Sequence, residues 1–145
     1  MNASAAAVAA AVTFVWLGMV LAISFLEAPL KFRAPGVTIP IGLGIGRLVF
    51  RALNIVEAVL AATVVVAVTA GNLPADVSVF TAVAAALLAA QLGVIRPRLS
   101  RRSDQVLAGG DPPRSRAHLS YVAFEAAKVV ALACLGTSIL LAAKL

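Results

Sequence analysis

The sequence predicts an all-α membrane protein, a bundle of four transmembrane helices in a single domain. Of the 145 residues, 62% are hydrophobic and 12% are charged, whereas a soluble domain is about half apolar and about a quarter charged. The mean hydropathy is +1.04. A membrane crossing needs about 20 residues, so the chain has room for four spans and one substantial loop. We expect the spans at about residues 5–30, 43–70, 77–95 and 118–143, with a basic cytoplasmic loop at 96–116.

Charge and cysteine content exclude several classes of function. The chain has 12 Lys and Arg against 6 Asp and Glu, but aromatic residues make up only 6% and the basic residues lie beside apolar segments. This distribution is typical of membrane topology and predicts no nucleic-acid partner. The single Cys134 excludes an intrachain disulfide, and no residue spacing predicts a metal site or a cofactor. Because no catalytic constellation stands out, we do not expect an enzyme.

The first span is predicted over about residues 5–30. Residues 5–26 carry no charge and no Lys or Arg precedes them, which indicates a retained span rather than a cleaved signal peptide. Trp16 falls in the middle of this span, where we expect it to pack against another helix. Beyond the span, residues 31–42 are punctuated by Pro and Gly and are expected to form a connector without regular helix.

The second span carries the polar residues around which the other spans are expected to be arranged. Residues 58–70 are uncharged but number only 13, so the helix has to begin near residue 45 to cross a bilayer. Arg51, Asn54 and Glu57 then lie within the membrane. A G-x-x-x-G pattern, Gly42 to Gly46, precedes them, and for it we favour local packing over dimerisation.

The third span, about residues 77–95, follows a short turn and has Gln91 as its only strongly polar side chain. The loop at 96–116 contains six Arg among Gly, Pro and Ser residues, and we expect it to be irregular except for a short helical turn near residues 104–107. The fourth span carries polar residues at steps of three, four and three, which place them on one helix face: His118, Tyr121, Glu125 and Lys128.

The positive charges predict how the chain is oriented. Region 31–51 holds four basic residues and loop 96–116 holds six, whereas the turn at 71–76 holds none. With four spans, both basic regions lie on the same side of the membrane, and the positive-inside rule makes that side cytoplasmic. We therefore predict a multi-pass protein of the cell membrane with both termini outside.

A polar cluster is predicted in the cytoplasmic half of the membrane. At 1.5 Å per residue, Glu57 and Lys128 lie at similar depth, close to the midplane. A charge at a span centre costs about 2.5–3.5 kcal/mol, so pairing would lower that cost. Glu57–Lys128 and Arg51–Glu125 are plausible pairs, and the sequence leaves open which pairs form. Intramembrane ionisable groups are functional by default, which makes the cluster a candidate substrate or ion site. Its members are Glu27, Arg51, Asn54, Glu57, Gln91, Tyr121, Glu125 and Lys128, with Lys31, Arg47 and His118 at its cytoplasmic mouth.

A structural interpretation stays open beside the functional one. A buried network of charges can serve only to fix the register of the helices. For Lys31, Arg47 and Arg51 we favour snorkelling or contact with lipid phosphate over a substrate role. The expected partners are the lipid bilayer and anionic lipid headgroups at the basic loops, with a homo- or hetero-oligomer as an open alternative.

Two stretches of the sequence resemble a known family. Residues 16–32 read W-L-G-M-V-L-A-I-S-F-L-E-A-P-L-K-F, residues 44–57 read G-x-G-R-L-V-F-R-x-L-N-I-V-E, and residues 116–120 add R-x-H-x-S. Together they resemble the TMEM205-like (DUF4149-type) small four-helix membrane proteins. The resemblance implies a small integral membrane protein, with transport or efflux suggested for some members, and supplies neither a substrate nor a catalytic residue. The positions that carry it are Trp16, Gly18, Ala28, Pro29, Phe32, Gly46, Arg47 and Phe50.

Three functions are compatible with these features. The leading hypothesis is a small transporter or channel-like protein for an ion, a proton or a small solute, with Glu57, Glu125 and Lys128 as its core groups. The alternative is a non-catalytic accessory or scaffold subunit of a membrane complex. A membrane enzyme acting on a lipid or quinone through His118, Tyr121 and Glu125 ranks last, because the sequence offers no nucleophile or metal set.

Overall fold

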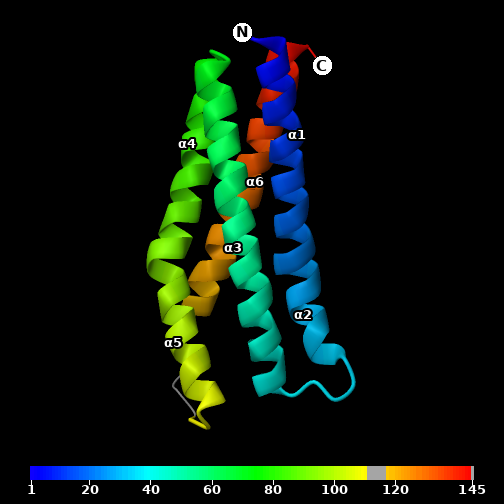
Figure 1. The fold of residues 1–145 in the computed structure, drawn as a ribbon, viewed down its shortest axis with the longest axis vertical. Coiled ribbons are helices and arrows are strands. Elements are labelled where there is room, and N and C mark those ends of the chain that lie inside the picture. The colour runs from blue at the N-terminus through cyan, green and yellow to red at the C-terminus, as the bar shows by residue number, and fades with distance from the viewer. Residues whose placement is uncertain (111–116, 145) are drawn as a thin grey trace.

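The computed structural model describes residues 1–110 and 117–144, without the side chains of residues 117 and 118. Its elements are all helical, which confirms the predicted all-α four-helix bundle. Figure 1 shows four long helical rods side by side, with the N- and C-termini at the same end. Each rod is long and apolar enough to cross a membrane, over Ala3–Arg33, Ile39–Ala70, Ala75–Leu107 and Leu119–Ala143.

The first rod is a composite of four helical segments. An α-helix, α1 (Ala3–Val20), continues into the wider π-helical segment η1 (Leu21–Glu27). One α-helical turn, α2 (Ala28–Leu30), and one 3₁₀ turn, η2 (Lys31–Arg33), complete it. The span therefore continues a few residues beyond the predicted end.

The second rod, α3 (Ile39–Ala70), is one unbroken helix that begins earlier than the sequence indicates. Residues 39–42 of the expected irregular connector are helical, so the prediction was wrong for them. The hydroxyl of Thr38 accepts a hydrogen bond from the N–H of Ile41 at 3.4 Å and so caps the helix. Pro40 lies in the first turn, where its missing N–H costs no intrahelical bond.

The third rod extends well beyond its predicted end. It consists of α4 (Ala75–Ala90), the π-helical segment η3 (Gln91–Ile95) and α5 (Arg96–Leu107). The expected irregular loop is therefore helical over its first twelve residues, and that prediction was wrong. Pro97 lies in the first turn of α5, where proline is tolerated, and the helix ends just before Gly109, whose φ of +87° suits a helix C-terminus.

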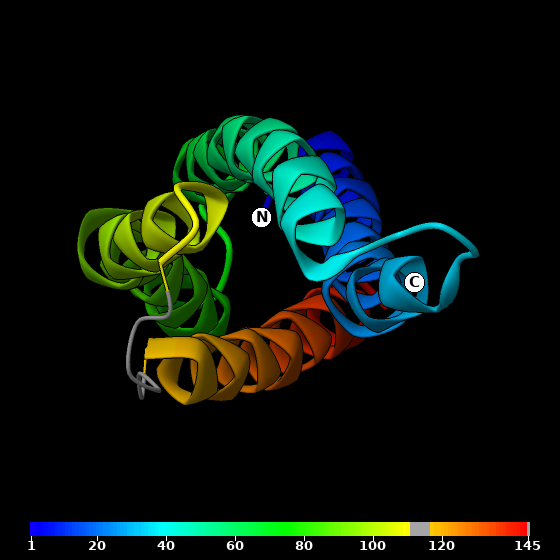
Figure 2. The same ribbon diagram turned by 90° about the horizontal axis from the view of Figure 1, so that it is seen from below.

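The fourth rod, α6 (Ala117–Ala143), closes the bundle. Seen along the bundle, each rod has two neighbours: α1 and α4 each pack against both α3 and α6 (Figure 2). Consequently α3 and α6 face each other across the bundle axis, and a side chain that joins them has to pass through the interior.

The outside of the bundle is apolar, and its core combines alanines with larger apolar side chains. Leu48, Leu119 and Leu141 are 73%, 69% and 75% exposed, among many large apolar side chains that point outward. A continuous apolar exterior is what a lipid bilayer requires. Between α1 and α6 the ring of Phe14 lies where a side chain on Gly136 would be, 2.6 Å from an added Cβ, so that glycine permits close helix packing.

Candidate functional site

Lys128 lies at the centre of a network of charges inside the bundle. Its side chain on α6 is completely buried, and its Nζ is 2.6 Å from Glu57 Oε1 and 2.6 Å from Glu125 Oε1. A third contact, at 2.7 Å, joins Nζ to Gln91 Oε1. An ammonium has three N–H donors, so these contacts use all of its capacity.

The two carboxylates have further partners on other rods. Trp16 donates its indole N–H to Glu57 Oε1 at 2.9 Å, and the hydroxyl of Ser24 donates to Glu125 Oε2 at 2.5 Å. Gln91 Nε2 donates to Glu125 Oε1 at 2.7 Å. All four rods thus contribute to what we call the buried ion network: Trp16, Ser24, Glu57, Gln91, Glu125 and Lys128.

Helix geometry explains part of this convergence. Glu125 and Lys128 are three residues apart on α6, so they share a face and pair with each other. Glu57 belongs to the buried stripe of α3, one turn beyond Leu53 and one turn before Ala61. Because α3 and α6 are opposite each other, the Glu57–Lys128 pair crosses the interior.

The two π-helical segments position Ser24 and Gln91. Segment η1 ends two residues before Pro29, and η3 ends two residues before Pro97. A proline has no N–H for the i−4 carbonyl and its ring crowds that carbonyl, so a wider turn just before it relieves the conflict. Each wide turn adds angular displacement along the rod and brings one polar side chain, Ser24 or Gln91, onto the network.

Burial makes the network expensive unless its contacts are complete. Glu57, Gln91, Glu125 and Lys128 are each at most 2% exposed. Withdrawing an ion from water costs several kcal/mol even after relaxation, and only close partners offset that cost. Removal of one partner would leave a buried charge uncompensated, so the network acts as a unit.

An aromatic and cationic layer separates the network from the end of the bundle that carries the basic residues. The rings of Phe50 and Tyr121 pack edge to face with centroids 5.7 Å apart. The Arg96 guanidinium lies 4.7 Å from the Phe50 centroid and 5.4 Å from the Tyr121 centroid. Lys31 Nζ approaches the same Phe50 ring at 5.5 Å.

The buried ion network contains four of the eight residues of the predicted cluster, and Glu27 contacts Lys31 instead. The expected Glu57–Lys128 pair is present, and Gln91 and Glu125 join it directly. Tyr121 is buried in the aromatic layer, on the side of the network that faces the basic end of the bundle. Asn54 is half-buried on the network side of α3.

Arg51 is the clear exception, because its side chain is exposed and does not reach Glu125. Of the two plausible pairs, Arg51–Glu125 does not form. Six residues at about 100° each place Arg51 about 120° around the helix from Glu57, on a different face. Glu125 pairs instead with Lys128, three residues away on its own helix.

The residues predicted at the mouth lie in different surroundings. Lys31 is nearly buried, with a side chain 10% exposed and Nζ 3.7 Å from Glu27 Oε2. Arg47 is exposed and forms an ion pair with Asp104 of α5 at 2.5 Å, which ties α3 to the extension of the third rod. The side chain of His118 lies outside the described residues.

The sequence did not predict the contributions of three residues. These are the hydrogen bonds donated by Trp16 and Ser24 and the position of Arg96 beside Phe50. Trp16 was expected to pack between helices, and its N–H donor was the available signal, since a buried indole normally finds an acceptor. For Ser24, the only indication in the sequence was that it shares a helix face with Glu27 and Lys31. Arg96 was assigned to a loop, and only the helical extension of the third rod brings it onto Phe50.

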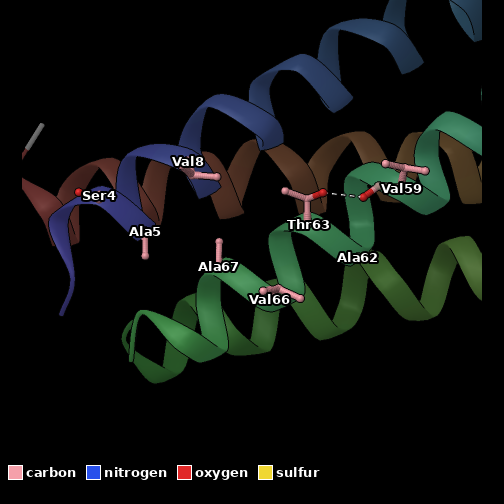
Figure 3. Close-up of a pocket in the computed structure, with 8 residues that line it drawn as sticks. All are labelled: Ser4, Ala5, Val8, Val59, Ala62, Thr63, Val66 and Ala67. Carbon is pink, nitrogen blue, oxygen red and sulfur yellow. Dashed lines mark hydrogen bonds between the residues drawn. The ribbon is translucent and has the colours of Figure 1, made fainter.

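A separate groove lies near the end of the bundle where the termini are. It has a volume of about 640 Å³ and is open and almost wholly apolar, between the first turns of α1 and the last turns of α3 (Figure 3). The hydroxyl of Thr63 at its edge donates to the carbonyl of Val59 at 2.8 Å, so even this polar group is satisfied. The groove carries no charged residue and does not belong to the buried ion network. Its lining consists of Ser4, Ala5, Val8, Val59, Ala62, Thr63, Val66 and Ala67.

Among the described residues no group of three or more His, Cys, Asp or Glu could hold a metal ion. The candidate site consists of the buried ion network and of the aromatic and cationic layer between that network and the basic end of the bundle. Comparison of the chain with protein-family models, curated proteins and solved structures gave no match.

Proposed function

We propose that the chain is a small membrane transporter or channel-like protein for an ion, a proton or a small solute, and that the buried ion network is its working site. The observation that supports the proposal is Lys128, fully buried and held 2.6 Å from two carboxylates in the interior of a membrane-length bundle. Intramembrane ionisable groups cost stability and mark ion or proton pathways.

Among these substrates, the geometry favours a proton. The groups of the network touch at 2.5 to 2.9 Å, so no ion or solute fits between them unless they first separate. A proton needs no such space, because a carboxylate and an amine can exchange one across a hydrogen bond. Glu57, Lys128 and Glu125 form a continuous chain of such contacts.

The proposed setting is the cell membrane, with both termini outside and the basic regions in the cytoplasm beside anionic lipid headgroups. The resemblance of residues 16–32 and 44–57 to the TMEM205-like family agrees with transport, which is suggested for some of its members. In this orientation the layer of Phe50, Tyr121 and Arg96 lies between the cytoplasm and the network, as an inner gate would. Opening it would require Arg96 to leave the two rings.

Proton flux into proteoliposomes, driven by a membrane potential and followed with an enclosed pH-sensitive dye, tests the proposal. Glu57→Gln and Lys128→Met are expected to abolish flux in protein that still inserts and elutes as a folded species. Arg51→Gln, which changes an exposed residue of the same helix, is the matched control and is expected to leave flux unchanged. Equal flux in the wild type and in both network variants would sink the proposal.

A second candidate is an accessory or scaffold subunit without transport activity. The observation that favours it is that the network links all four rods and leaves each charged group with close partners. In that case Lys128→Met lowers the free energy of unfolding by about 3–5 kcal/mol, the usual cost of breaking a buried pair. The same variant would reduce co-purification with a partner subunit, and the wild type would carry no flux above that of empty liposomes.

A further inference from the structure

Two cationic side chains, Lys31 and Arg96, converge on one aromatic ring at the basic end of the bundle. Lys31 Nζ lies 5.5 Å and the Arg96 guanidinium 4.7 Å from the centroid of Phe50. Lys31 comes from the end of the first rod and Arg96 from the third, so α3 holds the ring between them. Their charges are therefore no further apart than the sum of those two distances.

Among the described residues, Arg96 has no ion-pair partner and Lys31 has only a long one. Arg96 forms no ion pair there, and the nearest acid to Lys31 is Glu27 at 3.7 Å, longer than a hydrogen bond. The deep carboxylates of Glu57 and Glu125 are already bound to Lys128. Within residues 1–110 and 119–144, neither cationic side chain donates a hydrogen bond, although both are partly withdrawn from water.

Two glycines of α3, Gly42 and Gly46, make room for Phe32 and for the Lys31 side chain beside Phe50. Gly42, Gly46 and Phe50 recur every four residues along one face of α3. A Cβ on Gly42 would clash with the Phe32 ring, and one on Gly46 would lie 3.0 Å from Lys31 Nζ. The G-x-x-x-G pattern thus receives side chains of its own chain, which fits the expectation of local packing, and it fixes the ammonium beside Phe50.

We propose that Lys31 and Arg96 form a binding site for a phosphate-type oxyanion, supplied either by the headgroup of an anionic lipid or by free inorganic phosphate. A guanidinium offers a planar fork of donors that matches phosphate oxygens, and an ammonium adds a point charge. Lys31 lies two residues before the end of the candidate span Ala3–Arg33, and Arg96 shares the Phe50 ring with it, so we place the site near the level of the lipid headgroups. The site goes beyond the proposed function, because oxyanion binding does not require that anything be transported.

Glu27 is expected to oppose oxyanion binding. Its Oε2 is buried without a hydrogen-bond partner and is the only described carboxylate near Lys31. An oxyanion would compete with it for the ammonium. Glu27→Gln should therefore raise the affinity for the oxyanion, whereas a merely structural role of Lys31 predicts no gain.

The experiment uses the full chain in nanodiscs of phosphatidylcholine, with phosphatidic acid as the lipid probe and inorganic phosphate as the soluble probe. Retention of phosphatidic acid is measured by native mass spectrometry and phosphate binding by thermal shift. Arg96→Gln and Lys31→Gln are each expected to weaken binding by about tenfold or more, the usual effect of losing a charged hydrogen-bond partner. Arg98→Gln and Arg33→Gln, exposed neighbours of the same charge, are the matched controls and are expected to change binding less than about twofold.

The outcomes distinguish the two sources of the oxyanion, and they distinguish failure of this site from failure of the proposed function. Binding of both probes with the same dependence on Lys31 and Arg96 identifies free phosphate as a ligand, and binding of phosphatidic acid alone identifies the lipid headgroup. Equal losses in the variants and in the controls, or no preference for phosphatidic acid over phosphatidylcholine, would overturn the site. If Arg96→Gln does not fold, the loss of binding expected for Lys31→Gln and the gain expected for Glu27→Gln still test the site. Absence of proton flux refutes the proposed function and leaves this result untouched.

Discussion

The indole N–H of Trp16 shows how a single donor supports a buried charge. It lies 2.9 Å from Glu57 Oε1, the same oxygen that contacts Lys128. A buried carboxylate that accepts from both a cation and a neutral donor keeps its charge at lower cost than one held by the cation alone. Trp16 therefore has a role beyond filling the space between α1 and α3.

Replacement of Trp16 by Phe tests this role at the scale of one hydrogen bond. Hydrogen bonds to charged groups contribute about 1.5–3 kcal/mol, so we expect Trp16→Phe to lower the free energy of unfolding in detergent by about that amount. Loss of ring volume adds to the effect, and a double-mutant cycle with Glu57→Gln separates the two. If the hydrogen bond to the charge matters, the loss is smaller in the Glu57→Gln background. Strictly additive losses would contradict it.

The π-helical segments η1 and η3 are the elements that adapt regular rods to the network. Each contains a network residue, Ser24 or Gln91, and each precedes a proline by two residues. A π-helical turn behaves as an α-helix with one residue too many, and such turns are frequent at functional sites. The extra residue in η3 allows Gln91 to reach Lys128 while Arg96, five residues later, reaches Phe50.

Deletion of one residue from η3 should therefore be tolerated better than deletion from a neighbouring α-helical stretch. Gly93 is exposed and an added Cβ there meets nothing within 4 Å, so its deletion removes the extra residue without removing a packed side chain. We expect the Gly93 deletion to fold as a helical bundle, as judged by circular dichroism and size-exclusion chromatography. Deletion of Ala86, also exposed but within α4, rotates the rest of the rod by about 100° and is expected to prevent folding. Equal behaviour of the two deletions would contradict the interpretation of η3.

At the scale of the whole molecule, charge and topology agree. Both termini lie at one end of the bundle, and η2 and α5, which carry six of the 12 Lys and Arg residues, lie at the other (Figure 1). The turn that joins α3 to α4 at the end with the termini contains no Lys or Arg. An asymmetry of this kind orients a membrane protein with its basic end in the cytoplasm.

Reporter fusions test that orientation directly. Alkaline phosphatase, which is active only outside the cytoplasm, is expected to be active when fused to the C-terminus and inactive when inserted between Gly109 and Gly110. A fluorescent protein that matures only in the cytoplasm should give the reverse pattern. Fluorescence from the C-terminal fusion would overturn the predicted orientation and, with it, the cytoplasmic position of the Lys31–Arg96 site.

The sequence by itself determined that there are four membrane-length rods and which polar groups share a level along them. Apolar length forced four spans, and a rise of 1.5 Å per residue brought Glu57 and Lys128 to the same depth, where the structure pairs them. Only the tertiary structure decided which way each side chain points. Arg51 lies near the depth of the network but faces outward, whereas Arg96, assigned to a loop, stacks on Phe50. The physical reason is that depth follows from counting residues, while the angle around a helix accumulates small steps and shifts at every π-helical turn and proline.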